Sequence, residues 1–144
     1  MNAASKINLK FPKNSGFDKT EITIYGGKAN LVKLFYGHDA KKTRVLFVTD
    51  TNVASLECMK SFISHVEKQD KDKLLILQSG ESYKTMDSVL AIVKKALDCN
   101  FNRNCMFVGI GGGVITDMTA FAASIFKRGV DVEFVPTTLL CDVD

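Results

Sequence analysis

The sequence has little that would hold a metal ion or a disulfide framework. Its four cysteines show no CxxC spacing, and the whole chain has only two histidines, neither of them paired. Neither the closely spaced Cys and His ligands of a zinc site nor the cysteine pattern of a secreted disulfide scaffold is present. We therefore expect reduced thiols, mostly buried as small apolar side chains. His38 and His65 are expected to face solvent, and no metal ligand is assigned within the chain.

Long apolar runs and a strong charge of one sign are also missing. No stretch approaches the ~20 residues of a membrane span, and the start has no apolar segment of signal-peptide length. The expectation is a cytoplasmic protein without a membrane partner. The 19 Lys and Arg are scattered among 16 Asp and Glu, for a net charge of +3. This balance argues against nucleic acid as the main partner.

Apolar runs of strand length alternate with stretches of helical spacing through most of the chain. Apolar strands separated by helices imply parallel pairing through right-handed crossovers. The predicted fold class is α/β, a doubly wound parallel sheet of Rossmann type over residues 21–144, after a mobile segment at 1–20. The expected strands are 21–25, 45–48, 74–77, 106–110 and 132–135, and the expected helices are 29–35, 53–66, 86–97 and 114–125. Residues 136–144 follow without a polar tail, so a truncated polypeptide is expected.

The three glycines after the expected strand 106–110 are the sharpest functional signal. Gly111, Gly112 and Gly113 have no side chains to keep a diphosphate from the backbone, and the next helix offers free N–H groups and the positive end of its dipole. The segment is neither GxGxxG nor a P-loop. Alone, it is equally consistent with a tight turn from strand to helix. Asp117, expected in the first turn of that helix, either belongs to the site or complements the helix dipole.

Polar residues also follow the other three strands of this series. Ligands of open parallel sheets bind beyond the carboxyl ends of the strands, so several such loops indicate a site better than one does. Each loop has a simpler interpretation too: a helix N-cap, a solvated turn pair, or a rigid turn after proline. The residues concerned are Asp50 and Asn52, then Glu81 and Lys84, then Thr137 and Thr138.

Taken in order, these segments resemble the 3-dehydroquinate synthase family, within the wider group of sugar-phosphate cyclases. The likeness runs from about residue 25 to the last residue. The glycine segment, the RG pair and VPTTLL are highly specific at this spacing, and the earlier pieces support them. The matching segments are VTDTNV at 48–53, GESYK at 80–84, GGGVITD at 111–117, KRG at 127–129, VPTTLL at 135–140 and VD at 143–144.

The resemblance implies an NAD-dependent N-terminal domain and an α-helical C-terminal domain that holds a divalent metal, zinc or cobalt, beyond this chain. It implies a carbon–oxygen lyase of the shikimate pathway of aromatic amino-acid biosynthesis. The substrate is 3-deoxy-arabino-heptulosonate 7-phosphate, a seven-carbon sugar-acid phosphate. NAD transiently oxidises a ring hydroxyl, phosphate leaves, the ketone is reduced again and an aldol step closes the carbocycle, 3-dehydroquinate.

The resemblance also assigns residues. Arg128 is implied as a ligand of the substrate phosphate that can reach the partner subunit's site, which implies a homodimer; from the residues alone it is a cation at a helix end before Gly129. Asp144 is implied as a carboxylate near the reacting centre. The implied cofactor contacts are Asp50, Asn52, Ser79, Gly80, Glu81, Ser82, Tyr83, Lys84, Gly112, Gly113, Val114, Ile115, Thr116, Asp117, Thr137, Thr138 and Leu140.

One departure keeps other functions open. The family's usual GGGVIGD has glycine where this chain has Thr116, and threonine there is similar to cyclases that act on sedoheptulose 7-phosphate. A third possibility is an NAD- and metal-dependent polyol dehydrogenase of the glycerol dehydrogenase kind, against which the RG pair and VPTTLL stand. The 144 residues alone are expected to bind nucleotide, or merely to fold, without catalysis.

Overall fold

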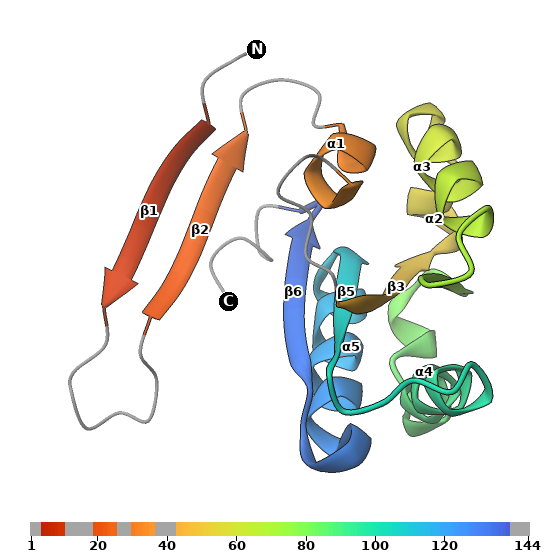
Figure 1. Ribbon diagram of the computed structural model, residues 1–144. Helices are drawn as coiled ribbons and strands as arrows, with labels where there is room; N and C mark the ends of the chain where they lie inside the picture. The colour runs from red at the N-terminus through yellow and green to blue at the C-terminus, as the bar shows by residue number, and fades with distance from the viewer. Residues whose placement is uncertain (1–3, 11–18, 26–29, 37–42, 139–144) are drawn as a thin grey trace. The chain divides into compact units, whose positions relative to one another are not determined.

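The computed structural model describes residues 4–10, 19–25, 30–36 and 43–138 (Figure 1). The chain divides into two compact units, Met1–Gly37 and His38–Asp144. In the first unit, strand β1 (Ala4–Lys10) pairs antiparallel with β2 (Lys19–Tyr25), and helix α1 (Leu31–Tyr36) follows.

The first unit corrects the expectation for the N-terminus. The sequence predicts a mobile segment up to residue 20, but residues 4–10 form a strand whose seven residues are all in register with β2. Strict alternation of apolar and polar side chains is the sequence signal of such a strand, and it is weak in residues 4–10. A boundary at residue 20 would cut through β2, and the chain divides after Gly37 instead.

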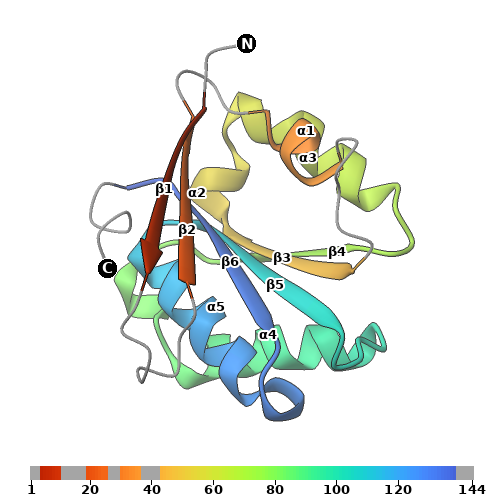
Figure 2. The same cartoon turned by 60° about the vertical axis from the view of Figure 1, so that its left-hand side comes forward.

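The second unit is a four-stranded parallel sheet with helices between the strands. Its strands lie side by side in the order β4-β3-β5-β6 (Figure 2). The elements are β3 (Arg44–Asp50), α2 (Thr51–Ala54), α3 (Glu57–Glu67), β4 (Lys73–Leu77), the 3₁₀ turn η1 (Glu81–Tyr83), α4 (Met86–Asp98), β5 (Cys105–Gly111), α5 (Gly113–Ile125), the 3₁₀ turn η2 (Phe126–Arg128) and β6 (Asp131–Pro136).

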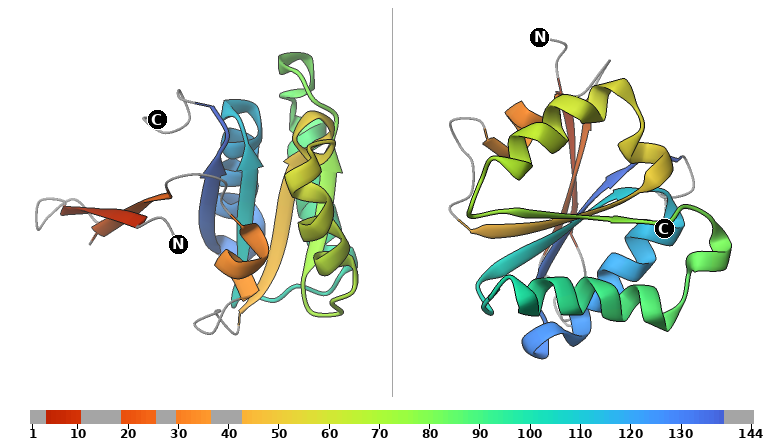
Figure 3. Two further views of the ribbon diagram at one scale, coloured as in Figure 1. Left: turned by 90° about the horizontal axis from the view of Figure 1, so that it is seen from above. Right: turned by 90° about the vertical axis from the view of Figure 1, so that its right-hand side faces the viewer.

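The helices cover both faces of this sheet. Figure 3 shows α2 and α3 on one face and α4 and α5 on the other. The chain leaves β3 in one direction to form β4, then crosses back through α4 to form β5 on the other side of β3. Strand order therefore reverses between β3 and β5, the switch point where open α/β sheets bind ligands. The predicted doubly wound α/β fold is confirmed.

A buried layer of apolar side chains fills each side of the sheet. All seven residues of β5 are buried, which explains their near-continuous apolar sequence. On one face Phe107 packs against Phe126, with ring centroids 5.3 Å apart. On the other, Phe47 meets Phe62 edge-on at 5.0 Å. Burying both faces makes β5 the centre of the core.

One helix differs from its prediction. The expected helix 53–66 is two helices, because α2 ends at Ala54 and α3 begins at Glu57. The Ser55 hydroxyl donates to the Asn52 carbonyl at 2.7 Å, and Leu56 is extended. Such local bonds compete with helix continuation, and the apolar spacing alone does not report them.

The cysteines and histidines match their predictions only in part. Cys58, Cys99 and Cys105 are free thiols, but only Cys105 is buried. Burial raises the pKa of the Cys105 thiol. His65 is half-buried, with its Nε2 3.3 Å from the Gln69 amide nitrogen. His38 and Cys141 lie outside the described residues. No helix in the described ranges has the length and apolar character to cross a membrane.

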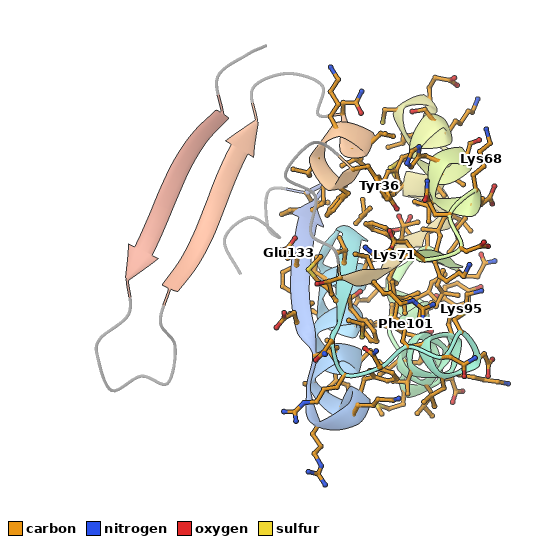
Figure 4. The ribbon with its side chains drawn as sticks, in the orientation of Figure 1. Tyr36, Lys68, Lys71, Lys95, Phe101 and Glu133 are labelled. Carbon is orange, nitrogen blue, oxygen red and sulfur yellow. The ribbon has the colours of Figure 1, made fainter. Side chains whose placement is uncertain are left out.

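Arg44 ties together two turns at the amino edge of the sheet, the one before β4 and the one after α4. Its guanidinium donates to the carbonyls of Lys71 (2.9 Å), Asn100 (3.0 Å) and Cys99 (3.1 Å). It also lies over the Phe101 ring, 4.3 Å from the centroid (Phe101 is labelled in Figure 4). The planar fork of five donors lets one side chain satisfy carbonyls that the end of α4 leaves open.

We predict that Arg44→Lys lowers the free energy of unfolding by about 1–3 kcal/mol, because lysine keeps the charge but cannot reach three carbonyls and stack at once. Urea unfolding followed by circular dichroism measures the loss. Arg103→Lys, an exposed change of the same kind, is the control and is expected to cost under about 0.5 kcal/mol. Equal losses for the two variants would contradict a structural role for Arg44.

Candidate functional site

The parallel topology places four polar loops at one edge of the sheet. The carboxyl ends of β3, β4, β5 and β6 all lie at this edge, which we call the carboxyl edge. The loops that follow contain most of the residues that the sequence predicts as cofactor contacts. Leu140 and Asp144 lie outside the described residues.

Hydrogen bonds join the loops after β3 and β4. The Thr51 hydroxyl donates to Ser79 Oγ at 3.1 Å and accepts the Ser79 N–H at 3.2 Å. Asp50 Oδ1 accepts the Val53 N–H at 2.9 Å, so Asp50 is the N-cap of α2. Asn52 is exposed in that helix. Thr51 was not among the predicted site residues. Its position between the two predicted residues Asp50 and Asn52 is the sequence feature that could have indicated it.

The loop after β4 reaches back over the sheet. Gly80, at φ 114°, turns the chain into the exposed turn η1, and Lys84 follows. Lys84 Nζ lies 2.8 Å from Asp117 Oδ2 and 3.8 Å from Glu81 Oε1. The hydrogen bond to Asp117, with the charges of Asp117 and Glu81, raises the pKa of Lys84 above its ordinary value. The three side chains, which we call the charged trio, connect two predicted loops.

The Lys84–Asp117 ion pair crosses the switch point. Lys84 follows β4, Asp117 lies in the helix after β5, and β3 is the strand between those two. The expectation that Asp117 lies in the first helical turn was wrong. Because α5 begins at Gly113, Asp117 is its fifth residue and the first turn has no acidic residue. Its carboxylate pairs with Lys84.

The glycine segment forms a narrow cradle at the end of β5. A Cβ at Gly111 would lie 2.9 Å from Ile115 Cβ, and one at Gly112 would lie 3.2 Å from Thr138 Cγ2. The Thr137 N–H donates to the Gly111 carbonyl at 3.0 Å, which joins the loops after β5 and β6. α5 then starts at Gly113, leaving its first N–H groups without partners within the helix.

The residues that follow in α5, 114–116, are mostly buried and contribute to the core more than to a binding surface. Ile115 is 1% exposed and belongs to the core, and its N–H donates to the Gly112 carbonyl. Thr116 is buried, and its hydroxyl donates to the Gly113 carbonyl at 3.2 Å. Val114 is half-buried. The surface available to a ligand here is the backbone of Gly112 and Gly113 together with Asp117.

Arg128 lies at the opposite edge of the sheet. It follows α5, which runs from the carboxyl edge back to the amino edge over 13 residues, or about 20 Å. Lys127, Arg128 and Gly129 all have positive φ, at 47°, 72° and 97°. The structure therefore does not bring Arg128 together with the predicted cofactor residues. Within the described ranges, no cluster of three or more His, Cys, Asp or Glu could hold a metal ion.

Comparison with known proteins decides the family. The model of the 3-dehydroquinate synthase N-terminal part matches residues 74–144. The 3-dehydroquinate synthase of Hydrogenovibrio crunogenus is 42% identical over 120 residues, which are 82% of this chain and 31% of that enzyme. The enzyme of Vesicomyosocius okutanii is 40% identical over 123 residues, 84% and 33% of the two chains. This chain belongs to the 3-dehydroquinate synthase family.

The chain spans about a third of the length of these curated family members. Solved structures agree on the fold. A 2-deoxy-scyllo-inosose synthase gives a TM-score of 0.67 at 21% identity, over 95% of this chain and 37% of its own. A 2-epi-5-epi-valiolone synthase from Streptomyces hygroscopicus subsp. jinggangensis, solved with NAD+ and Zn2+ bound, gives 0.60 at 30% identity, over 72% and 29%.

Family membership makes the glycine cradle the first target for mutation. We predict that Gly111→Ala lowers the free energy of unfolding by about 1–3 kcal/mol, because its methyl group would meet the buried, β-branched Ile115. Gly112→Ala is the matched control. Its methyl would meet only the exposed Thr138, which can move, so a loss below about 1 kcal/mol is expected. The reverse order in urea unfolding would contradict the cradle geometry.

The Lys84 ion pair predicts a pH dependence. A raised pKa means that the folded state favours the ammonium form, so the stability that Lys84 adds is complete below its ordinary pKa of 10.5. That stability is lost as the pH rises through the raised value. The difference in unfolding free energy between the wild type and Lys84→Met should be constant to about pH 10 and shrink above it. Lys94→Met controls for the change in net charge, and a difference independent of pH would exclude the pair as its source.

Proposed function

We propose that this chain is the NAD-binding part of a 3-dehydroquinate synthase, which converts 3-deoxy-arabino-heptulosonate 7-phosphate to 3-dehydroquinate with release of phosphate. Family membership supports the reaction. The observation that carries the cofactor is the glycine cradle at the switch point, where a single methyl on Gly112 would lie 3.2 Å from Thr138. The related valiolone synthase structure with NAD+ bound supports the same assignment.

The residues at the carboxyl edge suit the parts of a dinucleotide. The backbone of Gly112 and Gly113 lets a pyrophosphate approach the free N–H groups of α5, and Lys84 offers it a cation. The carboxylates of Glu81 and Asp117 can accept hydrogen bonds from the hydroxyls of the two riboses. The remaining proposed contacts frame the same edge: Asp50, Asn52, Ser79, Gly80, Ser82, Tyr83, Val114, Ile115, Thr116, Thr137, Thr138 and Leu140.

Bound NAD would supply the reversible oxidation of one substrate hydroxyl. The chain's own contribution is to bind and orient it. One carboxylate oxygen of Asp50 accepts a hydrogen bond from the Val53 N–H. This bond fixes the orientation of the carboxylate, and the other oxygen can contact a ligand. Thr51 and Ser79 hold the first two loops together. A cofactor that contacts both loops would therefore bind to segments that hydrogen bonds already hold together.

Arg128 would serve a different copy of the protein. A guanidinium suits the bidentate binding of a substrate phosphate, but Arg128 lies about 20 Å from its own cofactor loops. We therefore include a homodimer in the proposal, with Arg128 reaching the partner's site. Asp144 would lie near the reacting centre. Zinc or cobalt would bind to residues outside this chain, and we place the enzyme in the cytoplasm, in aromatic amino-acid biosynthesis.

The cofactor half of the proposal predicts that the 144-residue chain binds NAD+ saturably at one site, measured by calorimetry. Gly112→Val should weaken binding at least tenfold, because its side chain fills the cradle. Ser124→Val, an exposed change at the far end of α5, should have no effect. Circular dichroism verifies that both variants are folded. A chain that is folded but gives no heat with NAD+ would refute the cofactor assignment.

The reaction can be tested with a chimera in which this chain replaces the matching third of the Hydrogenovibrio crunogenus enzyme. Heptulosonate phosphate should yield inorganic phosphate with no net accumulation of NADH, because the cofactor is regenerated in each turnover. Sedoheptulose 7-phosphate is assayed beside it, and faster phosphate release from that sugar would favour the other cyclases. Steady accumulation of NADH with a polyol would instead support a dehydrogenase.

A further inference from the structure

The charged trio has a charge imbalance that the cofactor site alone does not explain. Lys84 contributes one positive charge, while Asp117 and Glu81, at 2.8 Å and 3.8 Å, contribute two negative charges. The group therefore carries a net charge of −1. A site meant only to attract phosphate would have an excess of positive charge. Here the one lysine is neutralised before any phosphate arrives.

The position of the trio makes this neutralisation effective. Asp117 follows Gly113 by four residues on α5, so the two lie on the same face of the helix, one turn apart. Helical side chains lean toward the N-terminus, which brings the Asp117 carboxylate over the first turn. Because Lys84 pairs with Asp117, its ammonium group lies on the β5 side of β3, near the first turn of α5 and the glycine cradle.

We propose that Asp117 is a specificity-determining residue of the cofactor site, which holds Lys84 in the ion pair so that small inorganic anions are rejected while a dinucleotide is admitted. The proposal rests on the proposed function, which places a pyrophosphate at this cradle. The competitor that matters most is the inorganic phosphate that the reaction releases.

The discrimination follows from hydrogen-bonding chemistry. An inorganic anion that binds Lys84 must displace Asp117, and then lies beside two carboxylates that accept but cannot donate hydrogen bonds. Like charges about 5 Å apart repel. A dinucleotide also displaces Asp117, but its ribose hydroxyls can donate to the carboxylates that its phosphates uncover. Only a ligand that carries both phosphates and diols satisfies the whole trio.

The pair is weak enough for the right ligand to open it. The Lys84 side chain is 39% exposed and that of Asp117 55%. Ion pairs this exposed contribute little to stability, so breaking one costs the dinucleotide little. The penalty on an inorganic anion comes from the carboxylate it leaves unpaired, which is a repulsive element of the kind that specific sites use.

The test compares inorganic pyrophosphate and NAD+ as ligands of the 144-residue chain at low ionic strength, by calorimetry. In Asp117→Asn, pyrophosphate should bind about tenfold more tightly than in the wild type, since a unit negative charge near the anion is removed. Affinity for NAD+ should not rise, so the ratio of NAD+ to pyrophosphate affinity falls at least tenfold. Asp98→Asn removes the same charge at the far end of α4 and should change neither affinity.

Two further variants show that the gain comes through Lys84. Lys84→Met in the Asp117→Asn background should abolish the tighter pyrophosphate binding. Glu81→Gln, an exposed change outside any α-helix, should give a smaller gain in the same direction, and it replaces Asp117→Asn if that variant is unfolded by circular dichroism. Unchanged pyrophosphate affinity in the folded variants would overturn the inference.

Different results would refute the specificity role of Asp117 and the proposed cofactor site. If the wild type binds NAD+ but Asp117→Asn gains no affinity for pyrophosphate, the specificity role is refuted and the cofactor site stands. If the wild type does not bind NAD+, the cofactor site is refuted. The pyrophosphate comparison then still shows whether Asp117 restrains Lys84.

Discussion

The close approach of α5 to β5 is the constraint on which the rest of the second unit depends. A Cβ at Gly109 would lie 3.0 Å from Thr119 Oγ1, and one at Gly111 would lie 2.9 Å from Ile115. Missing side chains on the strand thus let the helix pack directly on the backbone. The same absence opens the cradle at Gly112, so the feature that closes the core also shapes the proposed cofactor site.

This coupling explains which parts of the molecule the sequence predicts well. Buried parallel strands must be apolar along their whole length, so β3 to β6 were found within two residues of their ends. Alternation with helices then predicted parallel pairing, which places the four loops at one edge, but the strand order itself was not predicted. Four of the six family-specific segments include those loops, at the edge where ligands of such sheets bind, whereas KRG lies at the opposite edge.

Features held by particular side-chain geometry were not predicted. Arg44 and Asp72 look like ordinary charged residues in a polar stretch, yet Arg44 binds three carbonyls and the buried Asp72 accepts the Val45 N–H at 2.8 Å. Thr51 and the Lys84–Asp117 pair join residues that are about 30 apart in sequence. No periodicity reports such pairs, because they depend on rotamers and on which loops the fold brings together. The strand β1 was missed for a different reason, since its sequence alternates only weakly between apolar and polar side chains.

In the turn after α5, by contrast, the residues present are not the ones that would stabilise the fold best. Phe126 is buried against Phe107, and the Val130 N–H donates to the Ala123 carbonyl at 3.1 Å, so both sides of the turn are fixed. Between them Lys127 and Arg128 adopt positive φ, which costs long side chains roughly 1–3 kcal/mol each. Glycine or asparagine would fit both positions with less strain. Stability alone therefore does not account for an arginine here, whereas the proposed role of Arg128 as a phosphate ligand of the partner subunit's site would account for it.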